Sequence, residues 1–244
     1  MAFFINNLNQ KIAYKYIKGG NPGIIFVHGL NSDMQGIKAI TIEKYAKKNK
    51  LSFLRFDCRG HGKSFGKFED FVISDWKKDL IDLLDNIAKG PQIIVGSSMG
   101  GWLMMLAAKA RQKKVCGLLG LAAATDFGKS MYSSLSKKSK KEIKIKGFTK
   151  IKSYDFSYIL TKNFFIDAKK NNILNKPFRF NKPFILVHGM KDDVVNYKMP
   201  QKIMNKTKSN TVQVHYLKSS DHRLSSQEDL KCIIKAIDTI RILI

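Results

Sequence analysis

Short apolar runs recur along the chain and are separated by polar, lysine-rich stretches. The runs are residues 23–27, 51–56, 92–96, 115–121, 184–187 and 212–217. Runs that are apolar at consecutive positions, instead of at alternate ones, are typical of parallel strands that are buried on both faces of a sheet. We therefore expect these six segments to be the strands of one sheet.

Patterns with helical spacing lie between these runs. After Asp75, apolar residues recur every three or four positions until Gly90-Pro91 ends the pattern, and similar patterns follow Gly101 and begin at Leu230. This alternation predicts a doubly wound, mostly parallel α/β sheet with its functional loops at the carboxyl ends of the strands. At 244 residues, the chain is expected to form a single domain over residues 1–244.

One stretch, residues 124–180, interrupts the alternation. It is long for a connection, and connections of this length tend to be lids or binding elements. Helical patches within it predict a small helical cap inserted after the strand at 115–121. Within the stretch lies a cluster of aromatic residues, Tyr154, Phe156, Tyr158, Phe164 and Phe165, which either line a pocket or pack the cap onto the body.

Composition excludes several classes of protein. Hydrophobic residues make up 44% of the chain, which is too many for a disordered protein, and the apolar runs are too short to span a bilayer. The first residues lack the pattern of a signal peptide. Cys58, Cys116 and Cys232 are far apart and odd in number, which suits neither a disulfide framework nor a metal motif. We expect a cytoplasmic protein.

The chain is strongly basic, with 44 Lys and Arg residues against 19 Asp and Glu and a formal net charge of +25. Because the lysines are spread along the whole chain, the charge indicates a lysine-favouring genome more than a nucleic-acid interface, and nucleic acid is not an expected partner. The densest run, residues 137–141, is the one candidate patch, and transient contact with a membrane surface stays open.

The strongest chemical signal is Gly96-Ser97-Ser98-Met99-Gly100. It follows an expected strand and opens an expected helix, which is the context of a nucleophile elbow in α/β hydrolases. The small glycines allow the sharp turn that exposes the serine beside the amino end of the helix, where amides stabilise negative charge. We therefore predict Ser98 as a nucleophile, with the backbone amides of Met99 and Leu30 as its oxyanion hole.

A serine hydroxyl needs a base, and the base needs a third group that orients it. In this fold the acid and the histidine follow later strands in the order Ser, Asp, His, which selects Asp192 after residues 184–187 and His222 after residues 212–217. Other candidates are open: Asp193 and Asp221 for the acid, and His28, His61, His188 and His215 for the base. We expect His28 and His188 to be structural.

Five segments resemble one subfamily of α/β hydrolases, which contains the mitochondrial acyl-glucuronide esterase that is also described as a palmitoyl-protein thioesterase. They are HGLNSDM at 28–34 with KA at 38–39, FDCRGHGKS at 56–64, GSSMGGW at 96–102, HGMKD at 188–192 and DHRLS at 221–225. The resemblance implies hydrolysis of a small-molecule carboxylic ester or thioester by Ser98, Asp192 and His222, without a metal or organic cofactor.

Other functions are compatible with the same residues. A monoacylglycerol-type lipase or a serine peptidase would keep these three residues and differ in the cap. A non-catalytic protein that binds anionic partners through its charge is a third possibility. The sequence does not determine the acyl group, the leaving group or the oligomeric state.

Overall fold

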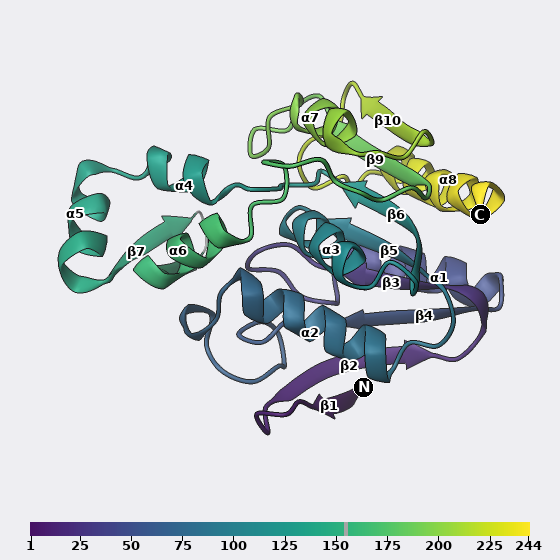
Figure 1. Cartoon of the computed structure of the whole chain (residues 1–244), viewed down its shortest axis with the longest axis horizontal. Helices are drawn as coiled ribbons and strands as arrows, with labels where there is room; N and C mark the ends of the chain where they lie inside the picture. The colour runs from purple at the N-terminus through teal and green to yellow at the C-terminus, as the bar shows by residue number, and fades with distance from the viewer. Residues whose placement is uncertain (154–155) are drawn as a thin grey trace.

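A mixed sheet of eight strands forms the centre of the protein (Figure 1). The computed structural model describes residues 1–153 and 156–244. From edge to edge the strand order is β1-β2-β4-β3-β5-β6-β9-β10. The strands are β1 Ala2–Ile5, β2 Lys11–Ile17, β3 Gly20–Val27, β4 Leu51–Phe56, β5 Gln92–Ser97, β6 Val115–Leu121, β9 Phe184–Gly189 and β10 Val212–Leu217.

The six strands predicted from the apolar runs form the parallel part of this sheet. Every residue of β4, β5, β6 and β9 is buried, which explains why their sequences are apolar at consecutive positions. The other two strands, β1 and β2, extend one edge of the sheet in antiparallel fashion. The predicted doubly wound, mostly parallel α/β sheet is therefore confirmed.

Helices cover both faces of the sheet, as Figure 1 shows. The pair α2 and α3 packs on one face and the pair α1 and α8 on the other, and each pair covers its own buried apolar cluster. The helices outside the cap are α1 Ile37–Lys48, the short 3₁₀-helix η1 Phe68–Asp70, α2 Ile73–Asn86, α3 Met99–Ala110, α7 Met199–Lys206 and α8 Gln227–Leu243. In the described part of the chain, no helix has the length and apolar character needed to cross a membrane.

The strand order reverses beside β3, and this reversal positions the site. After β3 the chain adds β4 on one side, and it then returns to add β5 on the other side. Val27 pairs in register with Gly96, so the loop that follows β3 and the turn that follows β5 begin side by side. Ligands of open α/β sheets bind in the crevice at such a reversal.

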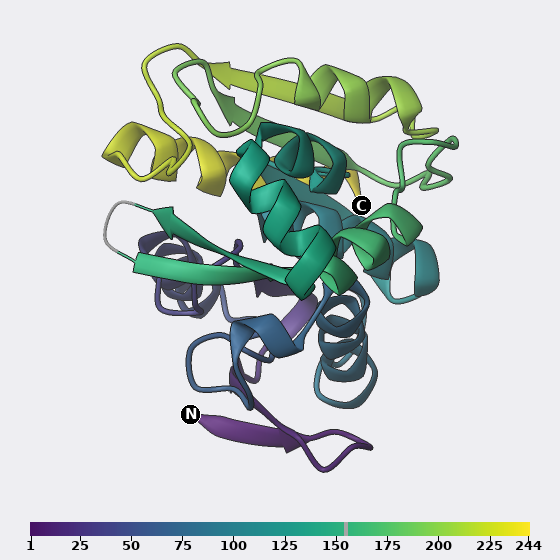
Figure 2. The ribbon, with the colours of Figure 1, turned by 90° about the vertical axis from the view of Figure 1, so that its left-hand side faces the viewer.

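The segment after β6 forms a cap that projects from the body (Figures 1 and 2). It contains the helices α4 Gly128–Ser134, α5 Lys137–Lys146 and α6 Lys162–Lys170. Between α5 and α6 lies an antiparallel hairpin of β7 Phe148–Ser153 and β8 Phe156–Thr161, so the expected helical cap is helical only in part. The hairpin was not predicted because its strands are short and lie in a lysine-rich stretch. Exposed Lys150 and Lys152 make the alternation along β7 hard to distinguish from a polar loop.

The aromatic residues of the cap serve both of the expected purposes. Phe164 packs its ring on α2, and Phe165 packs on α4. Tyr158 lines a cavity that reaches Ser98. Tyr154 lies outside the described residues, and of Phe156 only the backbone is described.

Hydrogen bonds hold the base of the cap on the body. Asp167 in α6 accepts bonds from the amide and the hydroxyl of Ser74 in α2, at 2.8 and 2.7 Å. Asp126 accepts the amides of Ile173 and Leu174 at 2.8 and 2.9 Å, which ties the two ends of the insertion together. The cap is thereby fixed at its base, close to the carboxyl ends of the strands.

A buried ion pair beneath this region provides a test of the fold. Arg59 Nε lies 2.6 Å from Asp79 Oδ1, with side chains 1% and 0% exposed. Asp79→Ala leaves the guanidinium with its hydrogen bonds to neutral oxygens and, among the described carboxylates, with the more distant Asp75 at 3.6 Å. We expect a loss of about 3 kcal/mol in the free energy of unfolding, which corresponds to roughly 6–12 °C in Tm for a chain of this size.

Thermal melting measures this effect, and Asp82→Ala is the matched control. Asp82 pairs with Lys78 in the same helix, but that pair is partly exposed and is expected to contribute only about 0.5 kcal/mol. Equal decreases in Tm for the two variants would contradict the larger stabilisation that we attribute to the Arg59–Asp79 pair.

Candidate active site

Ser98 occupies a sharp turn between β5 and α3. Its backbone has φ 52° and ψ −118°, a conformation that residues other than glycine rarely adopt. Close backbone approaches explain the glycines around it. A Cβ on Gly96 would lie 2.3 Å from the carbonyl oxygen of Gly100, and one on Gly100 would lie 2.2 Å from that of Val27. The strand, the turn and the helix predicted around this serine are therefore all present.

A chain of hydrogen bonds connects Ser98 with His222 and Asp192. The Oγ of Ser98 lies 3.1 Å from Nε2 of His222, and Nδ1 of His222 lies 2.8 Å from Oδ2 of Asp192. The three side chains come from loops after β5, β10 and β9. In this geometry the imidazole can accept the serine proton at Nε2 while Nδ1 donates to the carboxylate. The structure thus brings together the three residues that the sequence indicates.

The carboxylate of Asp192 is fully buried and is engaged on both oxygens. Its Oδ1 accepts the amides of Val194 and Val195 at 2.9 and 2.7 Å, while its Oδ2 faces His222. Burial opposes ionisation, but the hydrogen bonds from His222 and the two amides outweigh it and lower the pKa of Asp192. At neutral pH the imidazole of His222 therefore has a fixed anion beside Nδ1.

The alternative acids and bases have other environments. Asp193 is exposed, and Asp221 accepts the amide of Arg223 at 2.9 Å. The other four histidines have local partners: His28 Nε2 accepts the Cys58 amide at 3.0 Å, His61 Nε2 accepts the Asn31 amide at 3.3 Å, His188 Nε2 lies 2.9 Å from the carbonyl oxygen of Val195, and His215 Nε2 lies 3.4 Å from Gln213 Oε1. These contacts fit the structural roles expected for His28 and His188.

Leu30 and Met99, the two residues predicted to supply oxyanion-hole amides, both line the cavity at Ser98. Met99 is the first residue of α3, so its amide has no acceptor within the helix. The loop that carries Leu30 passes directly beside the serine, because a Cβ on Gly29 would lie 3.2 Å from the Cβ of Ser98. The role of these amides toward a bound oxyanion stays a prediction.

Three residues form hydrogen bonds that hold the loops of the site in place. The sequence did not predict this role for any of them. Asp57 and His61 accept amide hydrogen bonds from the loop after β3, at 2.7 and 3.3 Å. Lys38 in α1 donates to the carbonyl oxygen of Arg223, which follows His222. All three lie in the segments that carry the family resemblance, but sequence spacing does not reveal which loop each one supports.

A cavity of about 1000 Å³ extends from Ser98 and His222 into the cap. Its apolar lining from the cap consists of Phe127, Met131, Leu135, Ile151, Tyr158 and Leu160. Its polar lining there consists of Ser130, Ser134, Ser136, Ser139, Lys150 and Lys152. Among the described residues that line it, none carries a carboxylate. The cavity therefore suits an apolar group that reaches Ser98 and an anionic or neutral group at its lysines.

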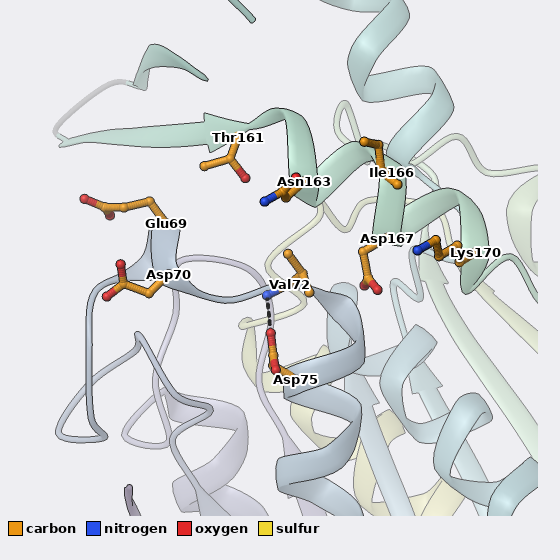
Figure 3. A pocket seen from close by; sticks show the side chains of 9 residues that line it. All are labelled: Glu69, Asp70, Val72, Asp75, Thr161, Asn163, Ile166, Asp167 and Lys170. Carbon is orange, nitrogen blue, oxygen red and sulfur yellow. Dashed lines mark hydrogen bonds between the residues drawn. The ribbon is translucent and has the colours of Figure 1, made fainter. Parts of the chain in front are cut away.

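A second cavity, of about 360 Å³, lies where α6 meets η1 and α2 (Figure 3). It has four carboxylates in its lining, those of Glu69, Asp70, Asp75 and Asp167. Asp70 and Asp75 each accept a backbone amide three residues earlier, and Asp167 is bonded to Ser74. No group of three metal-ligating side chains gathers in the described part of the chain. Ser98 does not line this cavity, so the candidate active site is the larger one.

A serine in a sharp turn between a parallel strand and the helix that follows it, on a sheet with this strand order, defines an α/β hydrolase. Residues 22–177 match the protein family described as "Serine aminopeptidase, S33". The chain is 40% identical over 232 residues to the palmitoyl-protein thioesterase ABHD10, mitochondrial, of Rattus norvegicus, with 94% of this chain and 78% of the relative covered. For the Homo sapiens protein the identity is 38%, with 94% and 76% covered. The chain belongs to the ABHD10 family of serine hydrolases.

Solved structures agree with this assignment. The α/β hydrolase domain-containing protein 10 from mouse is 36% identical and superposes with a TM-score of 0.91 over 99% of this chain and 98% of its own. A putative hydrolase from Agrobacterium vitis is 27% identical, with a TM-score of 0.91 over 98% and 97% of the two chains. The family resemblance noted in the sequence is therefore confirmed.

Proposed function

We propose that the protein hydrolyses acyl thioesters and carboxylic esters through Ser98, His222 and Asp192, by way of an acyl-enzyme. The observation that carries this proposal is the hydrogen-bonded chain of these three side chains, which opens into the large, partly apolar cavity. The names of the relatives, palmitoyl-protein thioesterases, support a thioester as the bond that is cleaved.

In the first half of the reaction, His222 takes the proton from the hydroxyl of Ser98 as the oxygen attacks the acyl carbon. The amides of Met99 and Leu30 donate to the oxyanion that forms. Collapse of this intermediate breaks the bond between the acyl carbon and the leaving sulfur or oxygen. Protonated His222 then gives its proton to the leaving thiolate or alkoxide, and the acyl group stays on Ser98.

In the second half, water replaces the leaving group. His222 takes a proton from the water, whose oxygen attacks the acyl carbon at the same oxyanion site. The carboxylic acid leaves, and the proton returns to Ser98. The lowered pKa of Asp192 favours its ionised form throughout the reaction, and the negative charge of Asp192 stabilises the imidazolium of His222.

The cavity favours a long acyl chain. Met131 of α4 and the residues at its two ends, Phe127 and Leu135, are spaced four residues apart and line the cavity along this helix, which leads away from the body (Figure 1). At about 1000 Å³ the cavity is at the upper end of the range for small-molecule sites. We therefore propose that the acyl chain lies along α4.

The family description suggests peptide hydrolysis as a second candidate. An aminopeptidase must bind the ammonium group of its substrate, for which a carboxylate is the natural partner. The described lining offers Lys150 and Lys152 in place of a carboxylate, so this observation favours esters and thioesters.

A substrate series tests the proposal. We expect kcat/KM for thioesters and esters to rise with acyl length from four to about sixteen carbons, by roughly fourfold for each methylene that becomes buried. Aminoacyl amides are expected to be poor substrates. Rapid amide hydrolysis together with slow thioester hydrolysis would overturn the proposal in favour of a peptidase.

A variant of α4 tests where the acyl chain lies. Met131→Trp fills the cavity beyond Ser98, so we expect kcat/KM for a hexadecanoyl thioester to fall by at least about tenfold, because several methylenes lose their site. The butanoyl thioester should change less than about twofold. Ser133→Trp, an exposed position of the same helix outside the cavity, is the control. An equal loss for both chain lengths would place the acyl chain elsewhere.

The cytoplasmic location expected from the sequence stays a proposal. The three cysteines are free thiols in the structure, which agrees with a reducing compartment. The relatives carry the word mitochondrial in their names, so fractionation of cells that express the full chain is the measurement that decides.

A further inference from the structure

The far end of the cap carries a surface that the proposed hydrolysis does not use. We propose that this surface docks on the headgroups of an anionic phospholipid bilayer. It consists of Lys137, Lys138, Lys141, Lys144 and Ile145 of α5 and Phe148 of β7, and it is called the cap tip below. Figure 1 shows α5 at the end of the cap that is farthest from the sheet.

Helical spacing places the lysines of the cap tip and Ile145 on one face of α5. Lys138, Lys141 and Ile145 follow one another at intervals of three and four residues. The other side of the helix turns inward, because Ile143 is 3% exposed and Ser139 lines the cavity. The outward face therefore combines cationic side chains with a large apolar one.

Two apolar side chains of the cap tip are unusually exposed. Ile145 is 69% exposed and Phe148 is 45% exposed. Gly147, with φ 83°, ends α5 and turns the chain into β7, so the two residues lie close together at the same corner of the cap. Apolar side chains beside lysines are typical of surfaces that enter the boundary between lipid headgroups and acyl chains.

The four lysines of the cap tip have no ion pair or side-chain hydrogen bond to any residue that the structure describes. Their neighbours differ, because Lys140 donates to the carbonyl oxygen of Ser133 at 2.7 Å. Glu142, the acid within α5, accepts from the hydroxyl of Thr149 at 2.6 Å. None of the four lysines is therefore paired with a described carboxylate, and each adds to the attraction of an anionic membrane.

The cap tip is continuous with the cavity that holds Ser98. Phe148, Lys150 and Lys152 alternate along β7 and so lie on one side of the strand. The last two also line the cavity, as does Ser136 at the start of α5. A bilayer bound at Ile145 and Phe148 therefore lies next to the cavity that we propose receives an acyl chain.

A bilayer fits this surface better than a nucleic acid does. Lysines attract either polyanion, and this attraction falls with salt in both cases. A phosphodiester backbone offers nothing that the side chain of Ile145 would contact favourably, whereas a headgroup region removes both Ile145 and Phe148 from water. The exposed apolar pair therefore decides in favour of lipid.

Vesicle co-sedimentation of the full chain tests the proposal. The vesicles are phosphatidylcholine alone or phosphatidylcholine with about one-third phosphatidylserine. The test variant replaces Lys137, Lys138, Lys141 and Lys144 by Gln, and a second variant is Ile145→Ser with Phe148→Ser. A matched control replaces four exposed lysines of the body by Gln, namely Lys44, Lys48, Lys89 and Lys113.

We expect the wild-type chain to bind the anionic vesicles at least about tenfold more tightly than the neutral ones, with most of this preference lost in the cap-tip lysine variant and kept in the body variant. The double serine variant should lose vesicle binding. It should keep its retention on the polyanion heparin, because its lysines are unchanged. Hydrolysis of a soluble butanoyl ester should be the same in all of them, because none of these residues lines the cavity. Equal vesicle binding by the cap-tip and body variants overturns the proposal, and so does a double serine variant that binds vesicles as the wild type does.

Discussion

Ser98→Ala is expected to abolish covalent labelling by a fluorophosphonate probe and to lower kcat for a thioester by about 10⁴-fold or more. The reason is chemical, because the reaction we propose breaks the acyl bond by attack of this hydroxyl, and a methyl group cannot form the acyl-enzyme. The hydroxyl lies 3.1 Å from Nε2 of His222, within reach of proton transfer. Residual activity would come only from binding and the oxyanion hole.

Ser97→Ala is the matched control for this experiment. Ser97 is the last residue of β5, is 8% exposed and does not line the cavity, so the same change one position earlier should keep both labelling and turnover. Circular dichroism and thermal melting show whether each variant is folded. Undiminished labelling of the folded Ser98→Ala variant would refute Ser98 as the nucleophile.

Much of the central sheet could be predicted from the sequence, because β4, β5, β6 and β9 are buried throughout and β3 is buried over its last five residues. Residues that touch helices on both faces must be apolar, and a short apolar run is a clear signal. The edge strand β1 was not predicted, although Ala2–Ile5 is apolar throughout, because it is only four residues long and three of them are exposed outside the core. The cap hairpin was missed for a similar reason: its strands cover little of the core, so local composition, rich in lysine, hides their alternation.

The candidate site was predictable to the extent that chain order determines it. Because loops at the carboxyl ends of parallel strands meet at one edge of the sheet, a serine, an acid and a histidine after three different strands can be expected to converge. Distances and orientations could not be predicted. Nothing in the spacing of Lys38 indicates that it holds the carbonyl of Arg223, since that contact depends on how α1 packs beside the last loop.

The basic run of the cap shows a different limit. The sequence marks residues 137–141 as a patch, but it does not show which lysines of the whole cap face outward and which line the cavity. The structure makes this division, with Lys150 and Lys152 of β7 in the lining and the exposed face of α5 outside it. The lysines of the cap therefore support two separate proposals, with Lys150 and Lys152 facing the substrate and the exposed face of α5 facing a membrane.

The choice between Asp192 and Asp193 gives the second large expected effect. Asp192→Asn should lower kcat for a soluble butanoyl ester by about 10⁴-fold, whereas Asp193→Asn should change it by less than about threefold. Asp192 is buried against His222, and Asp193 is exposed. The two variants make the same chemical change at neighbouring positions, so each is the control for the other.

The hydrogen bonds around Asp192 explain why an amide fails there. Oδ1 accepts the amides of Val194 and Val195, so in the Asp192→Asn variant an oxygen must stay at that position and the new NH₂ group must face His222. Nδ1 of His222 then becomes an acceptor, which moves its proton to Nε2, and Nε2 can no longer take the proton of Ser98. Measured kcat values for the two folded variants decide the assignment. A loss at Asp193 as large as that at Asp192 would mean that the acid loop rearranges before His222 acts as a base.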